Sequence, residues 1–210
     1  NGTVTVTTSG VEDGQTMTVA MNGKSYTNTV TTSQSIVTIP AADLQDLVDG
    51  QSYTVTASVS DTNGNSSQIT SSSFAVDRTA PAIGAIATSA LSWGEKLNPT
   101  EDDSNGTVTV TTSGVEDGQT LTLTLDGNNY TNTVTSNGTI VTIAAADLQA
   151  LTDGNAYSIT ANVSDAAGNA ATQVTSSAFQ VDRTAPAISA IGTNVISWGA
   201  LLNPTESQSD

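Results

Sequence analysis

The sequence contains no cysteine and no histidine, and only four of its 210 residues are lysine or arginine. Common zinc sites and nucleophile–base pairs need cysteine or histidine, so we expect no enzymatic activity. Twenty acidic residues bring the net charge to −16, which leaves no basic surface for the phosphates of nucleic acid. An anionic membrane surface is disfavoured for the same reason.

Long apolar runs are also absent, so we expect no membrane insertion by this segment. The chain begins in the middle of a repeating pattern with no signal peptide, as expected of a piece of a longer protein. A secreted protein without disulfides needs another source of stability, and a bound metal is one such source. Cysteine-free chains also occur in the cytosol, so this absence alone decides nothing.

The second half of the sequence repeats the first. Residues 1–16 recur without change at 105–120, an offset of 105 − 1 = 104, and one inserted residue near Thr172 raises the offset to 105. A unit of about a hundred residues is long enough for a domain with its own core. We expect three parts: 1–76, an Ig-like repeat lacking its first strand; 77–182, a complete repeat; and 183–210, the first-strand segment of the following repeat.

Alternation of apolar and polar residues predicts β-strands along nearly the whole chain. Leu121-Thr122-Leu123-Thr124-Leu125 is typical, and turn residues separate such runs. Seven strands, with turns about every 8–12 residues, favour an all-β fold of tandem seven-stranded Ig-like (Greek-key) β-sandwiches arranged as a rod. In the complete repeat we expect a helical turn at 145–151 and strands at 81–87, 107–113, 121–126, 130–135, 140–144, 157–164 and 172–181.

The parity of seven strands decides which loops share an end of the sandwich. The loops that follow the strands at 107–113, 130–135 and 157–164 return to the end at which the chain enters. Acidic and amide residues of these loops and of the linker should therefore meet there: Asp77, Glu116, Asp117, Asp165 and Asn169. The first repeat carries Glu12, Asp13, Asp61 and Asn65 at the same positions, and Asp182 follows the complete repeat as Asp77 follows the first.

Carboxylates, a carboxamide and backbone carbonyls are hard oxygen ligands, which suit Ca²⁺ with roughly six to eight ligands. We therefore predict Ca²⁺ as the cofactor, bound where neighbouring repeats meet. Taken singly, each segment has a plainer interpretation as a hairpin turn, a solvated turn or a strand cap. The cluster Glu101-Asp102-Asp103 lies at the opposite end, and its role stays open between a solvated charge run and ligands for the next junction.

Two further features have both a structural and a binding interpretation. We expect Trp93 and Trp198 to cover the core rather than to form a carbohydrate platform. Threonine rows such as Thr107, Thr109 and Thr111 are typical of the wet face of a twisted sandwich. The alternative is an ice- or glycan-binding module that uses these Thr-rich strand faces.

The runs DRTAPAI, GVEDGQTLTLTLDG and SDAAGNAA resemble the Ig-like extender repeats of giant bacterial RTX adhesins, a family that includes biofilm and ice-binding adhesins. The resemblance covers the whole chain. It implies an extracellular stalk on the bacterial cell surface, whose repeats project a ligand-binding region away from the cell and are rigidified by Ca²⁺. The ligands that it implies are Asp77, Glu116, Asp117, Asp165 and Asn169.

The partners expected of such a segment are neighbouring repeats of the same protein. The missing first strand of 1–76 adds a second expectation, because residues 183–210 of another chain could supply it by head-to-tail strand complementation. Alternatively, each segment such as 77–104 folds back onto the repeat that precedes it.

Overall fold

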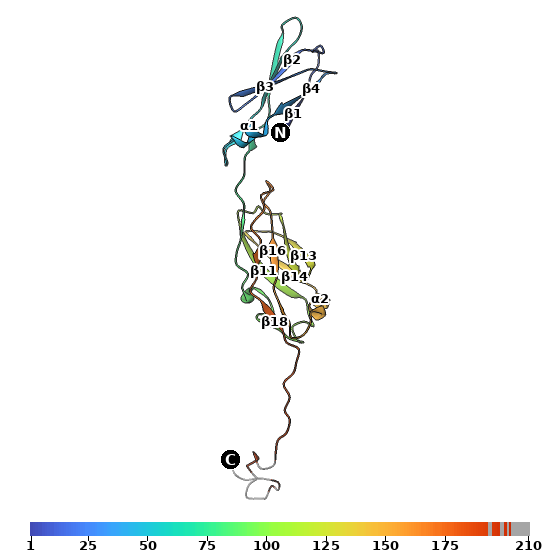
Figure 1. Cartoon of the computed structure of the whole chain (residues 1–210), viewed down its shortest axis with the longest axis vertical. Helices are drawn as coiled ribbons and strands as arrows, with labels where there is room; N and C mark the ends of the chain where they lie inside the picture. Colours follow the sequence, from blue (N-terminus) through green and yellow to red (C-terminus); the bar gives the residue numbers. More distant parts are fainter. Residues whose placement is uncertain (193–194, 198–199, 201, 203–210) are drawn as a thin grey trace.

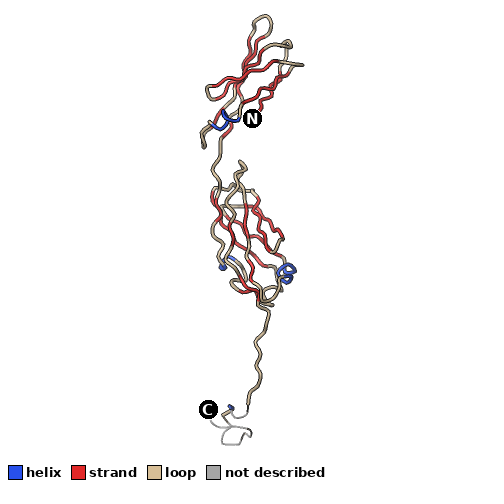
Figure 2. Tube along the Cα trace, viewed as in Figure 1, coloured by secondary structure: helices blue, strands red, loops and turns tan. Residues whose placement is uncertain are grey.

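The structure is a computed structural model that describes residues 1–192, 195–197, 200 and 202. Two β-rich lobes follow one another along the longest axis, and an extended segment continues beyond the second (Figures 1 and 2). The first lobe contains β1 (Gly2–Thr7), β2 (Thr16–Met21), β3 (Lys24–Thr29), β4 (Gln34–Ile39), α1 (Ala41–Gln45), β5 (Ser52–Tyr53), β6 (Thr56–Ser60), β7 (Ser66–Thr70) and β8 (Phe74–Ala75).

The second lobe repeats this order after additional elements at its start. It contains β9 (Ala82–Ile83), η1 (Thr88–Ala90), β10 (Lys96–Leu97), β11 (Gly106–Ser113), β12 (Thr120–Leu125), β13 (Asn128–Thr133), β14 (Gly138–Ile143), α2 (Ala145–Ala150), β15 (Ala156–Tyr157), β16 (Thr160–Asn162), β17 (Val174–Thr175) and β18 (Phe179–Val181). Its sheets have the strand orders β14-β11-β9, β13-β12-β16-β17 and β10-β18-β15. The prediction of an all-β fold with antiparallel sheets is confirmed.

The hairpins follow the sequence pattern closely. The strands predicted at 107–113 and 121–126 are β11 and β12, and the helical turn predicted at 145–151 is α2. Asp126 and Gly127 both have positive φ, 49° and 82°, as the tight turn between β12 and β13 requires. Residues on β11 alternate between buried valine and more exposed threonine, so this strand has one wet face.

The predictions for the last two strands were too long, because each is divided in two. Ser176 supplies the reason: its Oγ accepts a hydrogen bond from the N–H of Ile159 at 2.9 Å, where a neighbouring strand would offer a carbonyl. Ser71 makes the same contact to Val55 in the first lobe, at 3.0 Å. A hydroxyl in the ladder interrupts the regular strand, so that β15 pairs with β18 and β16 pairs with β17. β10, which runs parallel to β18, was not predicted from the sequence.

One continuous core fills the second lobe, and Trp93 lies inside it. Its indole is 4% exposed and meets the ring of Phe179 edge-on, with ring centroids 5.2 Å apart. Gly106 makes room for it, since a Cβ there would lie 2.5 Å from the indole. The core role predicted for Trp93 is confirmed, and Trp198 lies outside the described residues.

The segment before β11 belongs to the lobe that follows it. Within 77–104, β9 pairs with β11 and β10 with β18, both in the second lobe. The alternative in which 77–104 folds back onto the preceding repeat is therefore wrong. Within the part of the chain that the structure describes, no helix is long and apolar enough to cross a membrane.

Candidate functional site

The three loops predicted to share one end of the second lobe do contact one another. Glu116, in the loop after β11, accepts a hydrogen bond from the N–H of Ala166 in the loop after β16, at 2.8 Å. Asp117 accepts from the N–H of Ser136, in the turn before β14, at 2.7 Å. Carboxylates of one loop thus fix the backbones of the other two.

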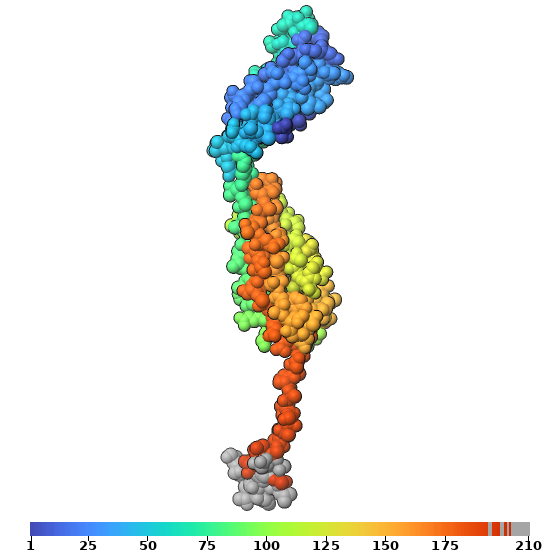
Figure 3. All heavy atoms as spheres, viewed as in Figure 1, coloured from blue at the N-terminus to red at the C-terminus, as the bar shows by residue number. Residues whose placement is uncertain are grey.

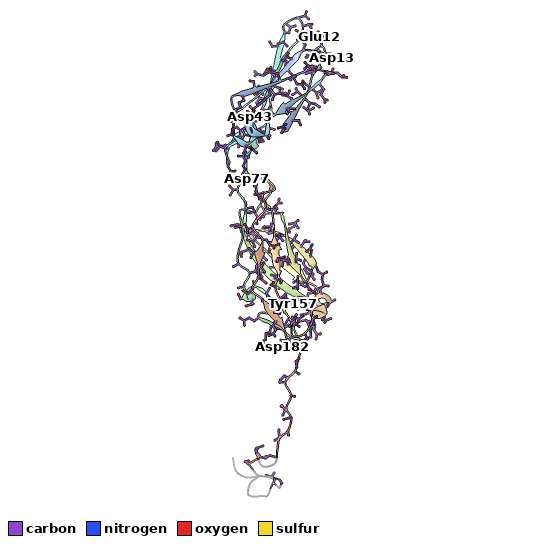
Figure 4. The ribbon with its side chains drawn as sticks, viewed as in Figure 1. Glu12, Asp13, Asp43, Asp77, Tyr157 and Asp182 are labelled. Carbon is purple, nitrogen blue, oxygen red and sulfur yellow. The ribbon has the colours of Figure 1, made fainter. Side chains whose placement is uncertain are left out.

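The linker joins this end of the lobe through Asn169. Its Nδ2 lies 2.8 Å from Oδ2 of Asp165, 3.2 Å from the backbone oxygen of Asp77 and 3.5 Å from Oδ1 of Asp77. Figure 4 places Asp77 between the two lobes, where the chain enters the second. Asp77, Asn169 and Asp165 therefore form one connected group at the junction.

Asp165 is the buried member of this group, with 3% of its surface exposed. Burial by itself raises the pKa of its carboxyl group, but hydrogen bonds from Asn169, Gly168 and Ala167 outweigh that effect and hold the pKa below its ordinary value. The Asp165 carboxylate is thus ionised at neutral pH. A negative charge is fixed next to the point where the linker enters.

The chemistry of these donors fits a hard cation. Among the described residues no three acidic side chains lie close enough to form a metal-binding cluster, so carboxylates alone do not make a site. The Nδ2 group of Asn169, however, faces three oxygens, one of them a backbone carbonyl. Mixed carboxylate, carbonyl and carboxamide ligands are typical of Ca²⁺. Turning the carboxamide over would add its own oxygen to the set.

Asp117 and its counterpart Asp13 stand apart from these contacts. Ser136 has a positive φ of 52° in a tight turn, and its N–H takes Asp117 as acceptor. Asp13 accepts from the N–H of Thr32 at 2.7 Å in the same way. The carboxylates of both residues hold turns, so the structure does not bring them into the Asp77–Asn169–Asp165 group.

The first lobe carries the same arrangement at its far end, where Figure 4 shows Glu12 and Asp13. Asp61 accepts from the backbone and the side chain of Asn65, both at 2.8 Å, and these bonds, the side-chain one first, lower its pKa. Glu12 accepts from the N–H of Thr62 at 3.1 Å, which lowers the pKa of Glu12. The network is therefore a property of each repeat.

Asp182 follows the second lobe as Asp77 follows the first. Its N–H donates to the backbone oxygen of Leu97 at 2.9 Å. Its carboxylate lies 3.2 Å from Nζ of Lys96, an exposed ion pair. The structure therefore places Asp182 at the lower end of the second lobe in Figure 4, beside a cation of its own chain.

Sequence reasoning missed the contacts of Arg183, the next residue. Its Nε lies 2.7 Å from Oδ2 of Asp102, and its two terminal nitrogens donate to the carbonyls of Leu151 and Leu148 at the end of α2, at 2.6 and 2.8 Å. Asp102 is 3% exposed. One guanidinium thus ties the outgoing linker to the helix and to a buried carboxylate.

This ion pair decides the role of Glu101-Asp102-Asp103, which the sequence left open. Asp102 is neither a solvated charge nor a free ligand, because Arg183 occupies its carboxylate. Glu101 accepts from the N–H of Asn98 at 3.0 Å and so closes a local turn. Asp103 is exposed.

An aspartate that precedes each linker also binds it, which the sequence did not predict. Asp153 accepts from the N–H of Arg183 at 2.7 Å and from the hydroxyl of Thr184 at 3.2 Å, and the bond from Arg183 is the main cause of its lowered pKa. Asp49 holds Arg78 and Thr79 in the same way in the first lobe. The Asp-Arg-Thr run of each linker is therefore fixed to the lobe that it leaves.

These features define a class of protein: tandem Ig-like β-sandwiches joined by a short linker, Asp77-Arg78-Thr79, that contacts both neighbours. A scan against models of protein families gives no match, and a search of curated proteins gives none either. The solved structures do give matches, and they agree with the class.

One similar structure is a Ca²⁺-stabilised adhesin that helps an Antarctic bacterium reach out and bind ice. It is 32% identical, over 89% of this chain and 45% of that one, with a TM-score of 0.51. A 1.5-MDa bacterial ice-binding adhesin is 30% identical over 87% of this chain and 58% of that one, with a TM-score of 0.49. A bacterial immunoglobulin-like domain of the M. primoryensis ice-binding adhesin is 31% identical over 49% and 95%, with a TM-score of 0.34.

The chain belongs to the family of Ig-like repeats found in the extender regions of large bacterial RTX adhesins, as its sequence indicates. It spans about half the length of the first two structures, 45% and 58%.

Proposed function

We propose that this chain is a calcium-rigidified stalk segment of a bacterial surface adhesin. It acts outside the cell, has no enzymatic activity, and holds the adhesin's ligand-binding region away from the cell surface. Its partners are the neighbouring repeats of the same protein. The observation that carries the proposal is the junction group, in which Nδ2 of Asn169 faces oxygens of both Asp77 and Asp165.

In this proposal Ca²⁺ is held at the junction by Asp77, Asp165 and Asn169, with Glu116 beside them. When bound, it neutralises the gathered negative charge and links the linker to the loops. Glu12, Asp61 and Asn65 serve the corresponding end of the first repeat, and Asp182 serves the junction after the second. Asp117 and Asp13 support the site by holding their turns, since their carboxylates accept from Ser136 and Thr32.

Residues of the chain itself hold a linker to the lobe before it and to the lobe after it. Arg183 and Asp153 bind the outgoing linker to the lobe that it leaves, without any metal. On the other side, the side chain of Asn169 connects Asp77 to the next lobe. Like charges gathered at this side repel one another unless a cation is present, so the joint should be loose without Ca²⁺. A ligand that binds only the assembled joint stabilises it by mass action.

A calcium titration by calorimetry tests the proposal. The chain should bind Ca²⁺, and Asp77→Ala should remove the heat that belongs to the junction while the fold, followed by circular dichroism, stays unchanged. Asp103→Ala is the matched control, since Asp103 is exposed and remote from the junction. No binding by the unmodified chain, or equal binding by the Asp77 and Asp103 variants, would refute the assignment.

A further inference from the structure

Asparagine is followed by glycine at five places in the chain: 1–2, 22–23, 63–64, 105–106 and 137–138. In such a pair the backbone nitrogen of the glycine can attack the side-chain amide of the asparagine, because glycine has no Cβ to hinder the approach. In a folded protein the reaction requires that this nitrogen is reachable by water and not held in a hydrogen bond. The five pairs differ in this respect.

Asn22 and Gly23 form the tight turn between β2 and β3. Both are exposed and both have positive φ, 47° and 74°. Met21 pairs with Lys24 across the turn, and in the part of the chain that the structure describes the N–H of Gly23 has no hydrogen-bond acceptor. A Cβ at Gly23 would find nothing within 4 Å. Water therefore reaches the attacking nitrogen, and none of its hydrogen bonds has to break.

The hairpin of β2 and β3 also stands clear of the rest of the molecule. It belongs to the blue surface of the first lobe, and the second lobe does not cover it (Figures 1 and 3). The contact between linker and second lobe therefore does not shield this turn.

Two other exposed pairs have a glycine nitrogen that is already bonded. The N–H of Gly64 donates to the backbone oxygen of Asp61 at 3.1 Å. The N–H of Gly138 donates to the backbone oxygen of Thr135 at 3.2 Å. Attack by either nitrogen requires that its turn first opens.

A further pair is held by its strand. Gly106 is buried on β11 opposite Ile143. Oδ1 of Asn105 accepts a hydrogen bond from the N–H of Ala145, at the start of α2, at 3.0 Å. The pair 1–2 is its counterpart, with the same bond from the start of α1. The pair at Asn22 is thus the one that the fold leaves ready to react.

We propose that Asn22 is a site of spontaneous deamidation in the folded protein. The backbone nitrogen of Gly23 loses its proton to water and forms a bond to Cγ of Asn22. The Cγ–Nδ2 bond breaks, and the amide nitrogen takes up a proton and leaves as ammonia, which gives a cyclic imide. Water then opens the imide. Cleavage of its bond to Cγ gives aspartate, and cleavage of its bond to the main-chain carbonyl carbon gives isoaspartate.

The second repeat shows which of these products the turn can hold. Asp126 stands at the position of Asn22 and is followed by Gly127, and their φ values are nearly the same, 49° and 82°. Aspartate at position 22 therefore keeps the turn, whereas isoaspartate adds a carbon to the backbone of a two-residue turn. The inference does not depend on calcium binding at the junction.

Peptide mapping by mass spectrometry tests the proposal. The folded chain is incubated at neutral pH and digested with trypsin, which places Asn22 and Asn63 on different peptides. The mass gain of an amide-to-acid exchange should appear at Asn22 at least about tenfold faster than at Asn63, Asn105 or Asn137, because the other pairs must first open. Equal rates at Asn22 and any of these three, or no conversion at Asn22, would overturn the proposal.

Incubation in guanidinium chloride separates the effect of the fold from that of the local sequence. Unfolding removes the hydrogen bonds that hold the other pairs, so the rates at Asn22 and Asn63 should become similar. If Asn22 keeps the same advantage in the unfolded chain, its neighbours in the sequence cause it, and the structural assignment is wrong.

The variant Asp126→Asn moves the site to the matching turn of the second lobe. A Cβ at Gly127 would also find nothing within 4 Å, so the introduced asparagine should convert about as fast as Asn22. Asn22→Gln is the negative control, because its longer side chain has to close a larger ring, and no conversion should occur at position 22. A stable asparagine at position 126 beside a reactive Asn22 would show that the turn is not the cause.

Discussion

The backbone oxygen of Asp77 accepts a hydrogen bond from Nδ2 of Asn169 at 3.2 Å, across 92 positions in the chain. This contact joins the linker that leaves the first lobe to a loop of the second. The same nitrogen also donates to the buried carboxylate of Asp165, so an amide and two acids meet where the linker enters the second lobe.

The ion pair between Arg183 and Asp102 should contribute to the stability of the second lobe. Asp102→Asn leaves the guanidinium without its charged acceptor, and hydrogen bonds to charged groups contribute about 1.5–3 kcal/mol. We expect a loss of free energy of unfolding of that order in urea titrations followed by Trp93 fluorescence in a Trp198→Phe background. Asp103→Asn, at an exposed neighbour, should be close to neutral. Equal effects of the two changes would remove the special role of the pair.

Replacing Gly106 by alanine should destabilise the protein more than the same change at Gly2, its counterpart in the first repeat. A methyl group at Gly106 would lie 2.5 Å from the indole of Trp93, whereas one at Gly2 would meet only the end of the Leu44 side chain, at 3.0 Å. Overpacking of this kind costs about 1–3 kcal/mol, so Gly106→Ala should destabilise the second lobe and change its near-UV circular dichroism. Gly2→Ala is the matched control and should cost less. The reverse order would contradict the packing described.

The hydroxyl of Ser176 should stabilise the second lobe, because it accepts a hydrogen bond from the N–H of Ile159. Ser176→Ala leaves the buried N–H of Ile159 without a partner, which costs about 1–3 kcal/mol. Ser177→Ala changes an exposed hydroxyl next to it and should leave the urea midpoint unchanged. If the two serines prove equivalent, the N–H of Ile159 has another acceptor.

Acid should weaken the junction loop through Asp165. Because the folded-state pKa of Asp165 lies below its ordinary value, the ionised carboxylate stabilises the fold at every pH above that ordinary value, about 3.9. This contribution is lost as the pH falls through the folded-state pKa. The difference in unfolding free energy between the unmodified chain and Asp165→Asn should therefore be largest near pH 7 and shrink below about pH 4. A difference that stays the same across this pH range would contradict the assignment.

Sequence reasoning reached the hairpins and the meeting of the loops because both depend on local patterns and on strand parity. Strand parity predicts that the loops of Glu116 and Ala166 share one end of the lobe, and the hydrogen bond between these residues shows that they do. The division of the last strands depends on one hydroxyl, Ser176, in a stretch with several serines, and no pattern distinguishes it. The partner of Arg183 was equally hidden, because Asp102 is one of three adjacent acids and lies 81 positions away.

Small-angle X-ray scattering of the chain with Ca²⁺ and with a chelator tests the central claim most directly. Scattering is measured over a concentration series and extrapolated to zero concentration, so that the maximum dimension reports single chains. We predict that the chelator shortens the mean maximum dimension and broadens the distance distribution, and that Asp77→Ala makes the chain insensitive to Ca²⁺. Identical scattering curves with and without Ca²⁺ would contradict a stalk whose joints are locked by the ion.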